Sequence, residues 1–107
     1  MLDKLAEIKN RFEKLSDKLG QPDVFKDQDQ FRRLSQEHSS LQEIVDSYNQ
    51  LLEFQKELES NQELADSNDE DPEIREMARH EISIFKQKLE EKEKQIQLLL
   101  LPKDPND

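Results

Sequence analysis

Apolar residues in the middle of the chain recur at steps of three, four and seven, which places them on one side of an α-helix. No Gly or Pro interrupts residues 31–64, whose apolar stripe consists of Phe31, Leu34, Leu41, Val45, Tyr48 and Leu52, with Ile44, Leu51 and Leu58 beside it. With a rise of about 1.5 Å per residue the helix is about 50 Å long, more than the width of a compact domain of this size. We therefore expect other parts of the chain to cover it.

Two stretches with the same spacing flank this central helix. The earlier one predicts a helix over residues 2–19, with its apolar positions at Leu2, Leu5, Ile8, Phe12, Leu15 and Leu19. Gly20 follows and is predicted to adopt the left-handed conformation that often ends helices. The later stretch predicts a helix over residues 72–100, with its apolar positions at Ile74, Met77, Ala78, Ile82, Phe85, Leu89, Ile96 and Leu99.

Short polar signals place the boundaries between these helices. Asp27 and Gln30 have the spacing of a capping box, so the central helix is predicted over about residues 28–65. Asp71, Pro72 and a following Glu predict the start of the last helix, since Asp caps and Pro is preset for a first turn. In the connector after Pro22, we expect Val24 and its neighbour Phe25 to fold back over the end of the bundle.

The predicted fold class is all-α, with three helices. Only 32% of the 107 residues are apolar and 39% are charged, which suits an elongated helical assembly, and a single Gly leaves little turn chemistry for strands. A short loop between the two long helices predicts an antiparallel, coiled-coil-like hairpin, with the first helix packed along it. We assign residues 1–101 to one helical domain.

The end of the chain departs from this pattern. Four consecutive leucines are apolar all round the helix, and the polar residues after them offer no cover: Leu98, Leu99, Leu100 and Leu101. We expect the chain to be part of a longer protein, with residues 102–107 as the start of a linker, because Pro102 ends the helix and Pro105 keeps the chain extended. In isolation these leucines are expected to mediate self-association.

The formal net charge of −10 is concentrated in the middle of the sequence. Residues 27–71 hold thirteen acidic and three basic residues, whereas the segments on either side are nearly balanced. Such a surface repels phosphate, so direct nucleic-acid reading is not expected. The acidic stretch either keeps the protein solvated or docks on a basic protein, in which case Asp66, Asp69 and Glu70 are the candidate contacts.

Candidate chemistry is almost absent from the sequence. There is no Cys, and the two histidines, His38 and His80, do not form a metal-binding pair, so they are expected at the surface or at the edge of the core. A single Gly excludes a glycine-rich phosphate loop within these residues. No catalytic, cofactor or metal site is predicted, nor is enzyme activity. Without a membrane-length apolar run or a signal peptide, we expect a soluble, cytoplasmic protein.

Three stretches resemble the N-terminal helical domain of the bacterial peptide chain release factor 1 family, the class-one factors for UAA and UAG stop codons. They are residues 31–45 (FRRLSQEHSSLQEIV), residues 71–78 (DPEIREMA) and residues 98–107 (LLLLPKDPND). The last is the most specific, because helical hairpins have no general reason to end in this way. The resemblance runs from Met1 to Asp107 and covers about the first third of a full-length factor.

The resemblance implies a division of labour. Release factors read the codon with a Pro-x-Thr tripeptide and catalyse release with a Gly-Gly-Gln loop, and neither motif occurs in these 107 residues. The domain is therefore expected to be non-catalytic and to orient its factor on the ribosome, since the family's first domain projects toward the stalk base of the large subunit. An alternative function is that of a free-standing acidic coiled-coil adaptor or holdase.

Overall fold

The computed structural model describes residues 1–102 and confirms the all-α prediction. Its elements are α1 (Leu2–Leu19), the 3-10 helix η1 (Pro22–Lys26), α2 (Gln28–Asp66) and α3 (Pro72–Leu99). These bounds differ from the predicted ones by one residue at most. Residues 103–107, most of the predicted linker, lie outside the described part of the chain.

Side-chain caps start both long helices where the sequence predicted. The Asp71 carboxylate accepts a hydrogen bond from the Glu73 amide at 2.9 Å, with Pro72 in the first turn of α3. At the start of α2, Asp27 accepts from the Gln30 amide at 3.1 Å. The return bond of a capping box, from the Gln30 side chain to the Asp27 amide, is not among the hydrogen bonds of residues 1–102. The second cap is therefore one-sided.

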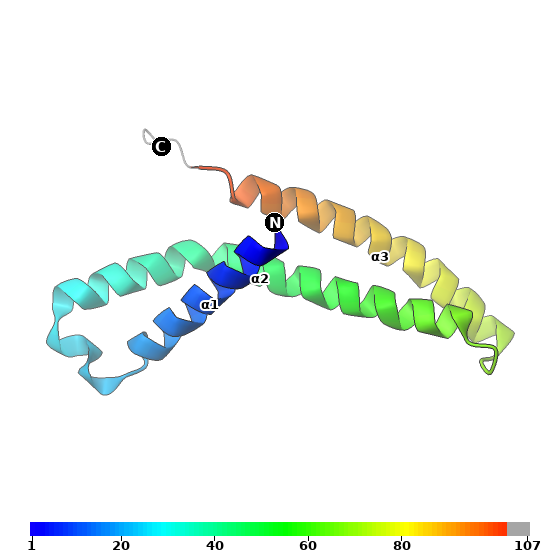
Figure 1. Cartoon of the computed structure of the whole chain (residues 1–107), viewed down its shortest axis with the longest axis horizontal. Coiled ribbons are helices and arrows are strands. Elements are labelled where there is room, and N and C mark those ends of the chain that lie inside the picture. Colours follow the sequence, from blue (N-terminus) through cyan, green and yellow to red (C-terminus); the bar gives the residue numbers. More distant parts are fainter. Residues whose placement is uncertain (103–107) are drawn as a thin grey trace. The chain divides into compact units, whose positions relative to one another are not determined.

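The chain divides into two compact units, and α2 contributes to both: unit 1 is Met1–Tyr48 and unit 2 begins at Asn49. In unit 1, α1 runs antiparallel to the first part of α2, joined to it through η1 (Figure 1). Ser16 Oγ lies 2.8 Å from His38 Nε2, and the Phe12 ring stacks on the same imidazole with centroids 4.2 Å apart. The fully or nearly fully buried apolar residues of this unit are Leu5, Leu15, Val24, Val45 and Tyr48.

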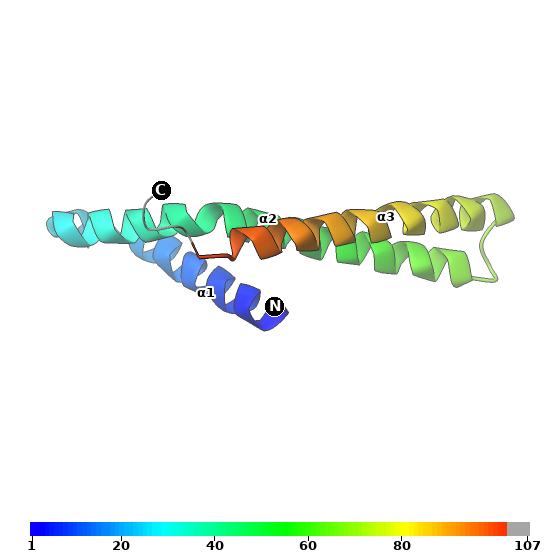
Figure 2. The same cartoon turned by 90° about the horizontal axis from the view of Figure 1, so that it is seen from above.

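In unit 2, α3 lies antiparallel beside the second part of α2, and Figures 1 and 2 agree on this pairing. The rings of Phe54 and Phe85 meet with centroids 6.1 Å apart, and the Lys88 ammonium lies 5.0 Å from the centre of the Phe85 ring. Further toward the end of α3, the Lys92 ammonium donates to the side-chain oxygen of Gln50. The predicted hairpin is thus present, and it uses only the second part of α2.

Three local predictions were wrong. Gly20 is right-handed, with φ −84°, because its amide bonds back to the Ser16 and Asp17 carbonyls and the chain tightens directly toward η1. Of the two connector residues, Val24 is buried but Phe25 is exposed, since η1 can turn only one of two adjacent side chains inward. The third concerns the apolar stripe of α3, where Ile74 and Met77, both predicted to lie in the core, are 42% and 68% exposed.

The leucines at the end of α3 are only partly exposed. Leu98 and Leu101 are the open ones, whereas Leu99 and Leu100 are half-buried. Two of the four leucines therefore present large apolar surfaces in unit 2.

Candidate functional site

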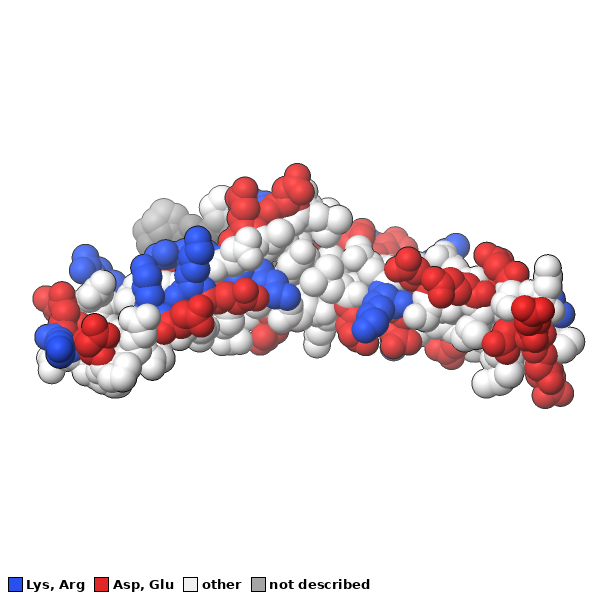
Figure 3. All heavy atoms as spheres, turned by 60° about the horizontal axis from the view of Figure 1, so that its bottom comes forward, with Lys and Arg blue, Asp and Glu red and all other residues white. Residues whose placement is uncertain are grey.

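The loop between α2 and α3 carries the three acidic residues singled out in the sequence. Asp66 is the last residue of α2, and Asp69 and Glu70 lie in the turn that leads to the Asp71 cap. Asp66 and Asp69 are exposed and Glu70 is half-buried. Figure 3 shows carboxylates gathered at this end of the α2–α3 hairpin, and we call Asp66, Asp69 and Glu70 the acidic loop.

The carboxylates of the acidic loop are available for contact. None of the three takes part in a side-chain hydrogen bond or an ion pair within residues 1–102, whereas Asp71 is engaged as the cap of α3. Like charges held on one short turn raise the local negative potential, which falls off over about 10 Å at 0.1 M salt. The three carboxylates thus concentrate negative charge on this turn, and none of them is held in an internal bond within residues 1–102.

An apolar residue beside this loop was missed by the sequence reasoning. A shallow hollow of about 610 Å³ on the first turns of α3 is formed by Met77 with Glu73, Glu76, His80 and Glu81. One turn before it, Ile74 is 42% exposed. Periodicity assigned both Ile74 and Met77 to the core, and the polar residues around Met77 were the one sequence signal that could have indicated otherwise. The arrangement offers an apolar contact inside a rim of carboxylates.

A second open surface lies in unit 1, where η1 meets the start of α2. Its main features are the rings of Phe25 and Phe31 and the guanidinium of Arg32, in a groove of about 660 Å³. Phe25 and Phe31 contact each other with centroids 5.0 Å apart. The charged residue of this groove is the basic Arg32, whereas those of the acidic loop are carboxylates, so the two surfaces suit ligands of opposite charge.

One charged pair is tied up in structure rather than available for binding. Arg11 of α1 makes two parallel hydrogen bonds to the Glu37 carboxylate of α2, one of them from Nη2 to Oε1 at 3.0 Å. These bonds lower the pKa of Glu37 and raise that of Arg11. The pair joins the two helices of unit 1.

The histidines occupy the positions expected of structural residues. His38 is half-buried between Ser16 and Phe12, and His80 is exposed on α3. In the described part of the chain, no three His, Asp or Glu side chains come together in a way that could hold a metal ion. Nor does any helix of residues 1–102 combine the length and apolar character needed to cross a membrane.

Comparison with known proteins gives one consistent match. The model of the PCRF domain family matches residues 8–107. The whole chain is 42% identical to Peptide chain release factor 1 of Alkaliphilus oremlandii and of Clostridium botulinum, and covers 30% of each. It is 43% identical to the protein of the same name from Oleidesulfovibrio alaskensis and covers 29% of it. The chain thus spans less than a third of the length of these relatives. No solved structure gives a significant match.

Proposed function

Because the chain belongs to the PCRF domain family, and its relatives are named release factors, we propose that it is the N-terminal, non-catalytic domain of a translation termination factor. In this proposal the whole factor directs peptide release at UAA and UAG codons in the cytoplasm. Residues 1–107 contain one Gly, so a Gly-Gly-Gln loop would lie elsewhere in the factor. The domain serves to orient the factor on the ribosome.

The docking surface in this proposal is the acidic loop together with Met77. The observation that carries it is the set of carboxylates at the end of the α2–α3 hairpin that form no internal bond within residues 1–102. Their charge suits a basic protein, and the ribosomal proteins near the large-subunit stalk base are the partner we propose. Met77, 68% exposed, adds an apolar contact of the kind found at the centres of protein interfaces.

Charge neutralisation in a full-length factor that carries this domain tests the proposal. We expect Asp66→Asn, Asp69→Asn and Glu70→Gln together to slow association with ribosomes about three- to tenfold at low salt, because exposed charges act mainly on encounter rates. The difference should shrink as added salt screens the remaining charges. The association rate comes from the dependence of peptide-release kinetics on factor concentration.

A matched control is available on α1. Glu7, Glu13 and Asp17 are exposed there and form no side-chain hydrogen bond or ion pair within residues 1–102, and Glu7→Gln with Glu13→Gln and Asp17→Asn removes the same charge. We expect this control to keep association within about twofold of the unchanged factor, since only charges near the contact steer docking. Equal slowing by both triple variants would show that net charge, not the acidic loop, sets the rate.

The same experiment tests the division of labour. At saturating factor, the rate of hydrolysis should be unchanged in the acidic-loop variant, because the proposed chemical step does not involve these residues. A lost hydrolysis rate would contradict the non-catalytic assignment. Codon preference is measured in parallel: release at UAA and UAG but not at UGA is the expected result.

The adaptor or holdase alternative predicts a different outcome. A free-standing holdase would slow aggregation of a denatured client protein without ribosomes. We expect the chain to have no such effect, because its family match favours a role in termination.

A further inference from the structure

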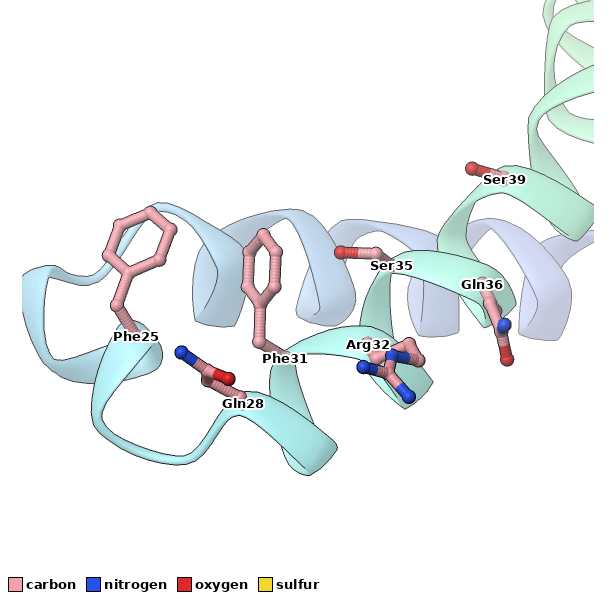
Figure 4. A pocket seen from close by; sticks show the side chains of 7 residues that line it. All are labelled: Phe25, Gln28, Phe31, Arg32, Ser35, Gln36 and Ser39. Carbon is pink, nitrogen blue, oxygen red and sulfur yellow. The ribbon is translucent and has the colours of Figure 1, made fainter.

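The groove in unit 1 has the features of a binding site that the proposed function does not use. Figure 4 shows the rings of Phe25 and Phe31 side by side, one from η1 and the other from the start of α2. Ser35 and Ser39 continue from them along successive turns of α2. The groove therefore has an aromatic end and a polar end.

Phe25 is exposed but is held in a defined place. It is 66% exposed, while its neighbour Val24 is buried and anchors η1. Contact with the Phe31 ring at a centroid distance of 5.0 Å supports it from one side. A rigid, exposed aromatic ring gains much contact area on binding and loses little conformational entropy, which is why such rings dominate binding energies. Phe25 is suited to anchor an apolar side chain.

The groove begins at the edge of the α2 face that α1 covers and extends onto the open side of α2. The contacts of α1 reach Glu37, His38 and Tyr48 of α2. At about 100° per residue, Arg32 and Ser39 lie about 100° or more around the helix from those positions, whereas Phe31 lies only about 20° from His38. Within unit 1 the groove thus runs from the edge of the packed face, at Phe31, to the open side of α2, at Arg32 and Ser39.

Arg32 gives the groove its charge. Unlike Arg11, it forms no ion pair with any residue that the structure describes. Arg32 and its neighbour Arg33 are two of the three bases in the otherwise acidic residues 27–71. A free guanidinium binds a carboxylate through two parallel hydrogen bonds.

We propose that this groove binds a peptide segment of a partner protein that carries an apolar side chain next to a carboxylate. The apolar side chain packs on the rings of Phe25 and Phe31, and the carboxylate pairs with Arg32. This site does not rest on the termination proposal: it lies in unit 1, uses a base instead of acids, and takes a ligand of the opposite charge.

The test uses the 107-residue chain and short end-blocked peptides. The probe is a Gly/Ser peptide with one Leu followed by two Asp; in one control peptide Lys replaces both Asp, and in another Ser replaces Leu. An oligouridylate of similar length is the nucleic-acid arm. Binding is measured by titration while amide NMR signals are followed, and we expect the Leu-Asp peptide alone to shift the signals of Phe31, Ser35 and Ser39.

Single variants assign the two contacts. Phe25→Ser should weaken binding of the Leu-Asp peptide about tenfold, and Arg32→Gln about three- to tenfold. Arg33→Gln, adjacent but outside the groove lining, and Leu64→Ser, an exposed apolar residue in unit 2, are the matched controls and should bind normally. Because Phe25 is exposed, its variant should keep the helical circular dichroism of the chain.

Four results with the probes would overturn the proposal. They are equal binding of the Lys peptide, unchanged affinity in folded Phe25→Ser, groove signals shifted by oligouridylate but not by the peptide, and no shift with any probe. If the groove signals instead shift with protein concentration alone, the occupant is a second copy of the chain, and the peptide assignment is wrong.

Discussion

Truncation of one leucine tests how unit 1 is held together. Leu15 of α1 has none of its surface exposed, and in unit 1 Leu5 is the one other large apolar side chain that is as well buried. Leu15→Ala removes three carbon atoms from water-free surroundings, which costs about 2.4 kcal/mol at about 0.8 kcal/mol for each. A cavity term adds to this, but two packed helices can close up partly, so we expect a total of about 3 kcal/mol.

A change of this size is large for a chain of this length. Domains are stable by about 5–15 kcal/mol, so one leucine would account for a substantial share. The midpoint of thermal unfolding should fall by roughly 10–20 °C. Urea unfolding followed by circular dichroism measures the free energy directly, and the slope of the transition should stay the same if the native and unfolded states keep their compactness.

Leu2→Ala is the matched control, because it makes the same chemical change in the same helix. Leu2 is 47% exposed, so the loss should be only about 1 kcal/mol. If the two variants lose equal stability, burial does not decide the energetics of α1. A loss below about 0.5 kcal/mol for Leu15→Ala would mean that α1 does not pack on α2 in solution.

Two further predictions concern charge and association. The side-chain hydrogen bonds from Arg11 lower the pKa of Glu37, so the stability that this pair contributes should be present above about pH 4.3, the value in unfolded chains, and be lost as the pH falls through the lower folded value. Urea midpoints of the chain and of Glu37→Gln should therefore differ near neutrality and converge in acid, while Glu43→Gln, exposed and outside the ion pairs of residues 1–102, stays close to the unchanged chain throughout. We also propose that the exposed leucines at the end of α3 mediate self-association; sedimentation should show a mass that rises with concentration, and Leu98→Ser with Leu101→Ser should weaken it, whereas a monomer at all concentrations would refute it.

Local signals in the sequence determined the helices of this protein. Asp71 and Pro72 start α3 because the carboxylate binds a free amide and the ring has its dihedral preset, and neither effect needs a distant partner. Asp27 acts in the same way at α2. The helix α2 could likewise be predicted without tertiary information, because its apolar stripe is not interrupted by Gly or Pro. The acidic loop was also evident from the sequence, since its charge and turn residues are contiguous.

The periodicity of apolar residues shows which face of a helix is apolar but not which other helix covers it. The tertiary structure decided which helix covers each face. The stripe of α2 is continuous, yet α1 pairs with its first part and α3 with its second. Met77 belongs to the stripe of α3 by spacing but stays exposed, because it lies among polar side chains near the loop. The sequence allowed a left-handed Gly20, but the hydrogen bonds of its amide to the Ser16 and Asp17 carbonyls keep it right-handed. In η1, Val24 points inward and Phe25 points outward, and the helical repeat of the sequence does not predict this arrangement. The contact between Phe25 and Phe31, and therefore the groove beside Arg32, depends on it.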